Sequence, residues 1–288
     1  MAGRACIERS EILRELCTKQ QKDEKMMQKV DFDFQRIAQG YRRRPFLHRQ
    51  VIERFQREVT SRTFEQGLDI GCGAGLSAKA LKLICRHVTG IDVSAEMIAA
   101  AKEVCGNEDG FEFMAGQAEK LPAFAQKFDI VTAAGVVQWV DMPLFLKGLW
   151  DKMNSRGYLL VYDFCISDKM KDCTAYTTWW HDVYLKAFPR PYRNEAVWTG
   201  EAVAQCGFWM LDQVQYELPC EFDLDSFIEF MMIQSNVNAK IEGEGRSAAE
   251  TAEWFRQSAG PLFQDGDGEQ GALRTLLFTG YSWYLQRK

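Results

Sequence analysis

The segment at residues 68–75 constrains the fold more than any other part of the chain. It reads LDIGCGAG, a run of buried-strand residues that ends in a glycine-rich turn and leads into a helix. Glycine has no Cβ and adopts positive φ without strain, so such a turn lets backbone amides approach a ligand closely. The pattern predicts a strand–turn–helix unit in which Gly71, Gly73 and Gly75 shape a ligand-binding turn.

An acidic residue follows this turn at the spacing of one strand–helix–strand unit. Residues 87–92 read HVTGID, which indicates a second strand that ends at Asp92. In nucleotide-binding units of this kind, the acid that binds the ribose lies about 20 residues after the glycines. We therefore expect a cofactor that contains a nucleoside.

Two residues argue against a dinucleotide cofactor. Dinucleotide sites use the pattern Gly-x-Gly-x-x-Gly, and Leu76 stands where this pattern requires its last glycine. Asp69 lies two residues before the first glycine, where its carboxylate would repel a pyrophosphate and attract a cation. The turn therefore favours a cationic cofactor without phosphate.

The pattern acid-Ile-Gly-x-Gly-x-Gly, with an acid at the end of the next strand, resembles the class I methyltransferases that use S-adenosylmethionine. The overall pattern is most similar to a type 11 group that includes trans-aconitate and malonyl-carrier O-methyltransferases, quinone C-methyltransferases and natural-product methyltransferases. The resemblance is close over residues 35–165 and extends to the rest of the chain by topology alone. Later strands and loops of the family are matched by residues 111–122, 128–134, 137–140 and 157–163.

The order of expected elements predicts an α/β fold. Strands alternate with helices over residues 66–163, which indicates a mostly parallel sheet with helices on both faces. Residues 208–218 and 276–285 are expected to be strands. The resemblance then implies a Rossmann-like sheet of seven strands, with the last strand antiparallel, and a helical cap.

We expect one methyltransferase domain over residues 1–288. Within it, residues 1–60 form an N-terminal helical segment and residues 61–164 form the cofactor-binding core. The remaining parts are cap insertions at 165–195 and 221–270 and completion of the sheet at 196–220 and 271–288.

The resemblance also implies which residues bind the cofactor. Asp92 would accept hydrogen bonds from the ribose hydroxyls, and Asp69 would reach the ammonium group directly or through water. Gln117 departs from the family pattern, in which many members carry Asp to accept from the adenine amino group; an amide oxygen can accept the same bond. The expected cofactor-binding residues are Tyr41, Asp69, Gly71, Cys72, Gly73, Gly75, Asp92, Val93, Met97, Gln117, Ala118, Glu119 and Ala134.

The acceptor side is predicted from position alone. The sulfonium already activates the transferred carbon, so the protein mainly orients and desolvates the reactants. Gln138 and Trp139 follow the fourth strand, and Trp179 and Trp180 lie in an aromatic segment that could line the acceptor pocket or belong to the core. His181 is a candidate general base, with packing or a surface position as the alternative. The sequence does not specify the acceptor, and the methylated atom is oxygen, nitrogen or carbon.

Composition limits the expected partners. The net charge of −5 gives no general electrostatic reason to bind nucleic acid or an anionic membrane. The nine cysteines include no Cys-x-x-Cys pair, which suits the cytoplasm and argues against a structural zinc site. We expect a cytoplasmic enzyme, a monomer or a homodimer, that uses S-adenosylmethionine and a small-molecule acceptor, with no metal and no membrane span.

Two other functions fit part of the pattern. An NAD(P)-dependent oxidoreductase would also use a glycine-rich turn and a following acid, but Asp69 and Leu76 disfavour it. A nucleoside-binding regulatory protein without turnover would carry the same cofactor residues, so only an assay separates it from an enzyme.

Overall fold

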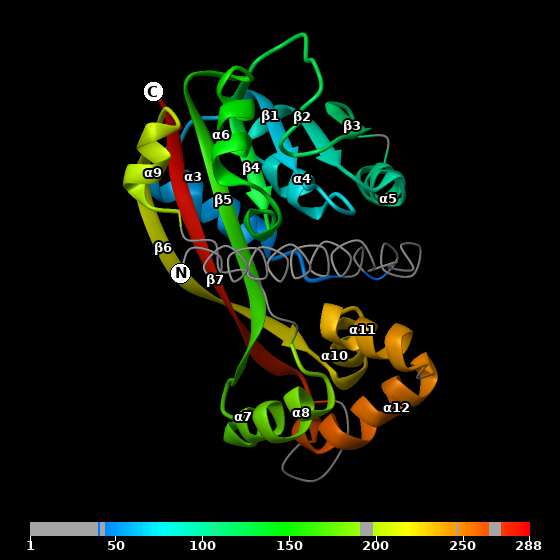
Figure 1. Ribbon diagram of the computed structural model, residues 1–288. Coiled ribbons are helices and arrows are strands. Elements are labelled where there is room, and N and C mark those ends of the chain that lie inside the picture. The colour runs from blue at the N-terminus through cyan, green and yellow to red at the C-terminus, as the bar shows by residue number, and fades with distance from the viewer. Residues whose placement is uncertain (1–39, 41–43, 107, 191–197, 246, 265–271) are drawn as a thin grey trace, which may run out of the picture. The chain divides into compact units, whose positions relative to one another are not determined.

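The computed structural model describes residues 40, 44–106, 108–190, 198–245, 247–264 and 272–288, all within the unit Gln35–Lys288. Among these residues, seven strands form one sheet in the order β3-β2-β1-β4-β5-β7-β6 (Figure 1). The strands are β1 Phe64–Ile70, β2 Cys85–Asp92, β3 Phe111–Ala115, β4 Phe128–Ala134, β5 Met153–Met170, β6 Phe208–Phe222 and β7 Arg274–Arg287.

The direction of the strands confirms the predicted fold class. β1 pairs in parallel with β2 and β4, β2 pairs in parallel with β3, and β4 pairs in parallel with β5. The last strand, β7, is antiparallel to both of its neighbours, β5 and β6. The result is a mostly parallel, Rossmann-like sheet whose four short strands end at a common carboxyl edge.

Helices cover both faces of the sheet. Alternate residues of β5 divide between two hydrophobic clusters, because side chains alternate between the faces of a strand. The first cluster joins the Leu160 and Tyr162 face to α3 His48–Glu58, α4 Leu76–Leu81 and α5 Ala95–Cys105. The second cluster joins the opposite face to α6 Met142–Trp150 and α9 Gly200–Gln205.

Local sequence accounts for where these helices begin. The Ser94 hydroxyl accepts a hydrogen bond from the Met97 amide, which caps α5. The Asp141 carboxylate accepts from the Leu144 amide and caps α6 in the same way. Most of the predicted N-terminal helical segment, residues 1–60, lies outside the described residues; within the described part, α3 is helical.

The last three strands are much longer than the first four. β5 has 18 residues, β6 has 15 and β7 has 14, whereas β1 has seven. β5 continues to Met170, past the predicted end of the fifth strand at residue 163, so the cap boundary predicted at residue 165 falls inside the strand. The reason is non-local: β7 pairs with β5 beyond Asp163, as in the pair Ile166 and Phe278.

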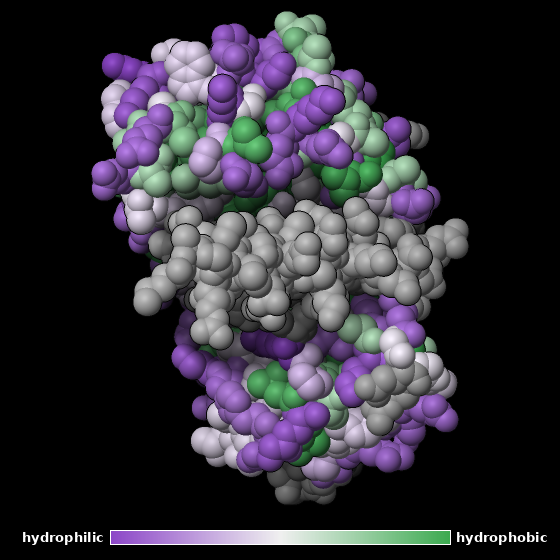
Figure 2. Space-filling model, in the orientation of Figure 1, coloured by the Kyte–Doolittle hydropathy of each residue, from purple (hydrophilic) through white to green (hydrophobic). Residues whose placement is uncertain are grey.

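A second group of helices lies at the far end of the long strands (Figure 1). We call this group the cap. Its core is aromatic: the Trp179 ring stacks on Tyr184 at 5.6 Å, and the Phe188 ring stacks on Phe255 at 5.4 Å. Figure 2 shows hydrophilic residues around a smaller hydrophobic area on this part of the surface. The cap helices are α7 Thr174–Trp179, η2 Trp180–Tyr184, α8 Leu185–Ala187, α10 Leu224–Met231, α11 Ser235–Glu244, α12 Ala248–Ala259 and η3 Gly260–Phe263.

No helix in the described part of the chain is long and apolar enough to span a membrane.

Candidate functional site

The predicted ligand-binding turn connects the carboxyl end of β1 to α4. Its three glycines, Gly71, Gly73 and Gly75, have φ values of 66°, 51° and 90°. The Cys72 amide donates to the Ile91 carbonyl at 2.9 Å, and the Gly75 amide donates to the Cys72 carbonyl at 2.9 Å. The turn is therefore fixed against the end of β2 by backbone hydrogen bonds.

Two of these glycines have different roles. A Cβ added at Gly75 would lie 3.1 Å from the Ala101 Cα, so Gly75 permits the turn to pack against α5. A Cβ added at Gly73 would meet no atom within 4 Å. Gly73 therefore faces open space at the carboxyl edge of the sheet, where ligands bind in open α/β folds.

Asp92, the last residue of β2, lies beside this turn. Its Oδ2 accepts a hydrogen bond from the Gly73 amide at 2.9 Å, and its Oδ1 accepts from the Ser94 amide at 3.0 Å. Burial raises the pKa of this carboxyl, and the backbone hydrogen bonds oppose that effect. The structure thus brings Asp92 and the glycine turn together, as their spacing predicted.

Asp69 lies beneath the turn and is fully buried. Its Oδ2 accepts a hydrogen bond from the Ser77 hydroxyl at 2.6 Å, and its Oδ1 accepts from the Thr132 hydroxyl at 2.7 Å. Burial raises the pKa of Asp69 to about 7, although both hydroxyl groups stabilise the ionised form. Asp69 therefore connects β1 to α4 and β4, and its expected contact with a cofactor ammonium group stays a prediction.

Cys72 is a packing residue. Its side chain is buried, and burial raises the pKa of its thiol far above neutrality, so no reactive thiolate is available. A Cβ added at the adjacent Gly90 would lie 3.1 Å from the Cys72 Sγ, which shows how little room this position offers. Among the described residues, no group of three His, Cys, Asp or Glu side chains is arranged to hold a metal ion.

The residues predicted to surround the adenine lie at the ends of β2 and β3, which are adjacent strands. Val93 is 73% exposed, and the side chain of Met97 packs on Ala74 and Ala100. Gln117 is exposed and Ala118 is partly buried. The Glu119 Oε1 accepts a hydrogen bond from the Asp141 amide at 3.3 Å, so this loop also contacts the start of α6.

The carboxyl end of β4 lies next to β5. Ala134 pairs with Tyr162, and the Gly135 amide donates to the Tyr162 carbonyl at 2.8 Å. A Cβ added at Gly135 would lie 3.5 Å from the Asp163 Oδ1. Gln138 and Trp139 follow in the 3-10 helix η1, Val137–Trp139; Gln138 is partly buried and Trp139 is 65% exposed.

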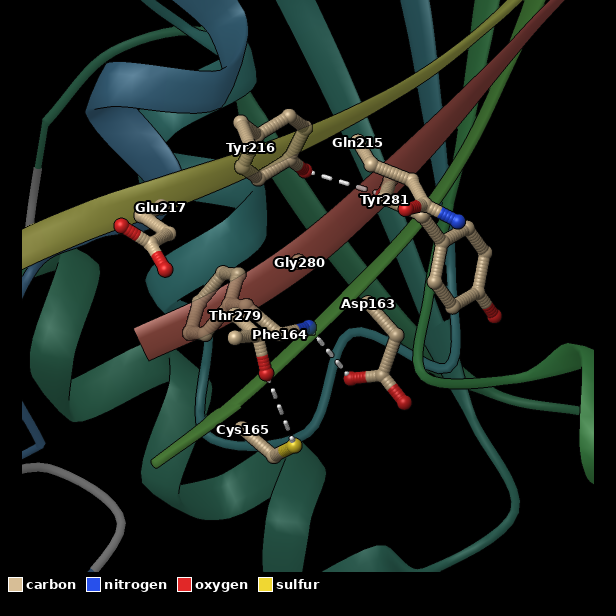
Figure 3. Close-up of a pocket in the computed structure, with 9 residues that line it drawn as sticks. All are labelled: Asp163, Phe164, Cys165, Gln215, Tyr216, Glu217, Thr279, Gly280 and Tyr281. Carbon is tan, nitrogen blue, oxygen red and sulfur yellow. Dashed lines mark hydrogen bonds between the residues drawn. The ribbon is translucent and has the colours of Figure 1, made fainter. Parts of the chain in front are cut away.

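A pocket of about 670 Å³ lies next to this point on β5, β6 and β7 (Figure 3). The strand register places Asp163, Tyr281 and Gln215 in one row across the three strands. The row beyond it contains Cys165, Thr279 and Glu217. Because directly paired residues share a face of a sheet, these six side chains lie on the same face. The full lining is Asp163, Phe164, Cys165, Gln215, Tyr216, Glu217, Thr279, Gly280 and Tyr281.

Sequence reasoning missed this pocket because it ended the fifth strand at residue 163. The signal that could have found it is the alternation of apolar and polar residues at 214–218, which read VQYEL. In the structure Tyr216 and Leu218 are buried, whereas Gln215 and Glu217, which alternate with them, are exposed. Such a period of two indicates a strand with one face on the core and one face available to a ligand.

His48 is a second residue that sequence reasoning missed. Its Nδ1 lies 2.8 Å from the Tyr162 Oη, and its ring packs edge-on against Phe164 at 4.9 Å. Burial, with the nearby Arg44, lowers its pKa to about 3, so the imidazole is neutral at physiological pH. His48 lies on the face of β5 that α3 covers, opposite to the face with the pocket.

Tyr41 lies outside the described residues. The structure does not bring His181, Trp179 and Trp180 to the carboxyl edge of β4. Both tryptophans are buried in the cap, and the exposed His181 binds Asp168 with 2.8 Å between Nε2 and Oδ2. Asp168 lies six residues beyond Tyr162 along β5, a separation of roughly 20 Å at the rise of a strand. The expectation that His181 acts as a general base therefore has no geometric support.

Comparison with known proteins agrees with this geometry. Residues 68–161 match the methyltransferase domain family. Over 141 residues the chain is 34% identical to malonyl-[acyl-carrier protein] O-methyltransferase of Haemophilus ducreyi, covering 47% of this chain and 52% of that protein. Over 133 residues it is 28% identical to the mitochondrial ubiquinone biosynthesis O-methyltransferase of Saccharomyces cerevisiae, covering 42% of this chain and 43% of that protein.

A solved structure from Anaeromyxobacter dehalogenans, provisionally assigned as a type II methyltransferase, has the same fold with a TM-score of 0.58 at 20% identity. The comparison covers 83% of this chain and 95% of that one. Residues 68–161 therefore contain a methyltransferase domain, and the described part of the chain has the fold of a class I S-adenosylmethionine-dependent methyltransferase. The chain spans about half the length of the curated relatives described above.

Proposed function

We propose that this protein transfers the methyl group of S-adenosylmethionine to a small-molecule acceptor. The observation that carries the proposal is the glycine turn with open space at Gly73 and the Asp92 carboxylate beside it. This arrangement supplies backbone amides and a carboxylate where a nucleoside-containing cation would bind, and a methyltransferase domain family matches the same residues.

The residues present fit that cofactor. A carboxylate accepts more than two hydrogen bonds, so Asp92 can bind ribose hydroxyls while it keeps its bonds to Gly73 and Ser94. Val93 and Met97 would contact one side of the adenine, and Gln117 its edge, with Ala118 and Glu119 in the same loop. Asp69 would contribute negative charge beneath the turn, which favours the cationic methionine part of the cofactor.

Orientation and exclusion of water would provide most of the catalysis. The bound cofactor supplies a carbon that the sulfonium activates for displacement. Ala134 would lie near the transferred group, and Gln138 and Trp139 would position the acceptor beside the carboxyl end of β4. His181 has no part in this scheme because it lies on the surface of the cap. Free cysteines in the described residues support a reducing compartment, from which we infer a cytoplasmic enzyme.

The test is calorimetry of the full chain with S-adenosylmethionine, S-adenosylhomocysteine and NAD. We expect both sulfur compounds to bind with similar affinity, since most contacts lie away from the methyl group, and we expect no binding of NAD. Comparable binding of NAD with no binding of the sulfur compounds would overturn the proposal. Transfer of labelled methyl into small molecules then separates an enzyme from a regulatory protein that binds the cofactor without turnover.

A further inference from the structure

We infer that the pocket on β5, β6 and β7 binds the acceptor, and that Tyr281 selects an acceptor that carries an aromatic ring. This inference rests on the proposed methyl transfer and adds the class of acceptor. A volume of about 670 Å³ suits a small molecule rather than a single ion. The position of the pocket, the sizes of its side chains and the packing of Tyr281 support the inference.

The pocket lies beside the end of β4. Gly135, the first residue after β4, lies against the Asp163 side chain, and Asp163 pairs directly with Tyr281 on the next strand. Paired strands lie about 4.8 Å apart, so Tyr281 is one strand away from the residue that contacts this end of β4. Ligands of open α/β sheets bind at the carboxyl ends of the strands, where the glycine turn and Ala134 also lie. A molecule that contacts Tyr281 can therefore present an atom to the transferred methyl group.

A change in side-chain size along β7 forms the hollow of the pocket. Trp283, Tyr281 and Thr279 project from the same face of the sheet, because side chains alternate along a strand. Two large rings are thus followed by a small side chain, and the partner of Thr279 on β5, Cys165, is also small. Thr279 and Cys165 are both exposed. The hollow therefore lies over these two residues, and the Tyr281 ring forms its wall on the side nearest the end of β4 (Figure 3).

The Tyr281 ring is the last in a series of packed aromatic rings. Phe145 on α6 packs against the buried Trp198, with 5.9 Å between the ring centroids. Trp198 packs against Trp283 at 5.5 Å, and Trp283 packs against Tyr281 at 5.0 Å. This series fixes the side of the Tyr281 ring that faces Trp283. The other side faces the space above the smaller Thr279, so a planar ring in the hollow would add one more member to the series.

Neutral hydrogen-bonding groups surround the hollow. The Tyr281 hydroxyl, the Gln215 amide and the Thr279 hydroxyl line it, and each of these groups can both donate and accept a hydrogen bond. Burial raises the pKa of the Tyr281 hydroxyl, so this group stays protonated and can donate. Such groups bind the polar substituents of a ring, such as a phenol hydroxyl or an aromatic amine, without requiring that the acceptor carry a charge.

Cys165 allows binding in the hollow to be measured before any acceptor is known. Its exposed thiol lines the pocket, with Sγ 3.8 Å from the Thr279 Oγ1. The probes are naphthol and decahydronaphthol, which share a carbon skeleton and a hydroxyl group but differ in aromaticity. The full chain is incubated with either probe and with S-adenosylhomocysteine, which fills the expected cofactor site. Peptide mass spectrometry then gives the rate at which neutral iodoacetamide modifies Cys165, with Cys206 at the end of α9 as the internal reference.

We expect naphthol to protect Cys165 at about fivefold lower concentration than decahydronaphthol, as one aromatic stacking contact would produce. Tyr281→Leu should remove this difference, because leucine keeps an apolar surface without a ring, whereas Tyr281→Phe should keep it. Trp209→Leu is the matched control, since Trp209 is an exposed ring on β6 outside the lining. Equal protection by the two probes, or an unchanged difference in Tyr281→Leu, would overturn the inference.

Turnover gives the second measurement. Labelled S-adenosylmethionine is incubated with the full chain and with metabolite extract, and the ultraviolet spectrum and accurate mass of the labelled product show whether it contains an aromatic ring. We expect an aromatic product, and we expect Tyr281→Leu to need about fivefold more extract for half-maximal labelling while affinity for S-adenosylhomocysteine stays within about twofold. A product without an aromatic ring overturns the inference and leaves the proposed function intact. No product at all counts against the proposed function, and the protection of Cys165 then decides the inference by itself.

Discussion

The two ends of the sheet form their sites in different ways. At the carboxyl ends of β1 and β2, backbone amides and one carboxylate, Asp92, make the candidate cofactor site. On the long strands β5, β6 and β7, side chains that project from one face make the pocket. The first site depends on a short stretch of chain, and the second depends on pairing between distant strands.

This difference predicts which substitutions each region tolerates. A backbone site is lost when a side chain fills its space, because the amides cannot move without breaking the turn. A side-chain site can change its specificity while the strands keep their hydrogen bonds. The cofactor region should therefore be sensitive to added volume, and the pocket should be sensitive to the chemistry of single side chains.

The largest expected effect is a loss of stability in the cap that leaves cofactor binding unchanged. Phe255 on α12 is fully buried and stacks on Phe188, so Phe255→Ala should lower the free energy of unfolding by about 3–5 kcal/mol. Affinity for S-adenosylhomocysteine should stay within twofold under conditions where the variant is folded. Urea unfolding and calorimetry measure the two quantities, and a parallel loss of both would show that the two regions act as one unit.

Gly73→Val tests the backbone site directly. The new side chain would enter the open space beside the turn, and we expect affinity for S-adenosylhomocysteine to fall by about 1,000-fold or more, roughly 4 kcal/mol. Gly245→Val is the matched control, since Gly245 also has positive φ and a Cβ added there would also meet no atom within 4 Å, but Gly245 ends α11 in the cap. Similar losses of affinity in both variants would indicate general backbone damage rather than a filled site.

Asp92→Ala tests the carboxylate of the same site. Loss of charge-assisted hydrogen bonds to the ribose should weaken cofactor binding by about 1.5–3 kcal/mol in calorimetry. Asp129→Ala is the control, because Asp129 also accepts bonds from two backbone amides, those of Glu65 and Gln66, but lies at the amino end of β4. Unchanged affinity in Asp92→Ala would reject the ribose assignment.

The cofactor end of the sheet could be predicted from sequence because its determinants are local. The glycine turn and Asp92 are separated by one helix and one strand, so their spacing alone implies that they meet at one edge. The number of strands and the antiparallel last strand followed from the resemblance to a family with known topology. Nothing in these inferences required knowledge of how distant segments pair.

The pocket and the cap could not be predicted in the same way. The length of β5 is set by its pairing with β7, where Cys165 meets Thr279, and no short-range pattern contains that information. An aromatic segment such as the one around Trp179 and Trp180 has the same sequence whether it lines a pocket or forms a core. Only the packing of α7 against α10 and α12 shows which of these two roles it has. The burial of Asp69 could not be predicted for the same reason, because its carboxylate accepts hydrogen bonds from both Ser77 on α4 and Thr132 on β4.

The pH dependence of cofactor binding sharpens the role of Asp69. Burial raises the pKa of Asp69 to about 7, so this carboxyl is protonated in a growing fraction of molecules as the pH falls below that value. A cationic cofactor favours the ionised form, and its affinity should therefore fall by about tenfold between pH 8 and pH 6. Asp69→Asn removes the titrating group and should flatten the profile in calorimetry. An equally steep profile in this variant would assign the titration to another group.

The smallest expected effect concerns the edge of the adenine. Gln117 is exposed at the end of β3, and its amide oxygen can accept a bond from the adenine amino group, although its NH₂ group can also donate to an oxygen at the same place. A carboxylate can only accept, so Gln117→Asp should keep or improve affinity for S-adenosylhomocysteine, by less than about 1 kcal/mol. It should also weaken binding of the hypoxanthine analogue S-inosylhomocysteine, which presents an oxygen there. Calorimetry with both compounds gives the selectivity ratio of the two proteins. Because the comparison is made between two ligands on each protein, any general loss of folding cancels. An unchanged selectivity ratio would show that Gln117 does not contact the adenine.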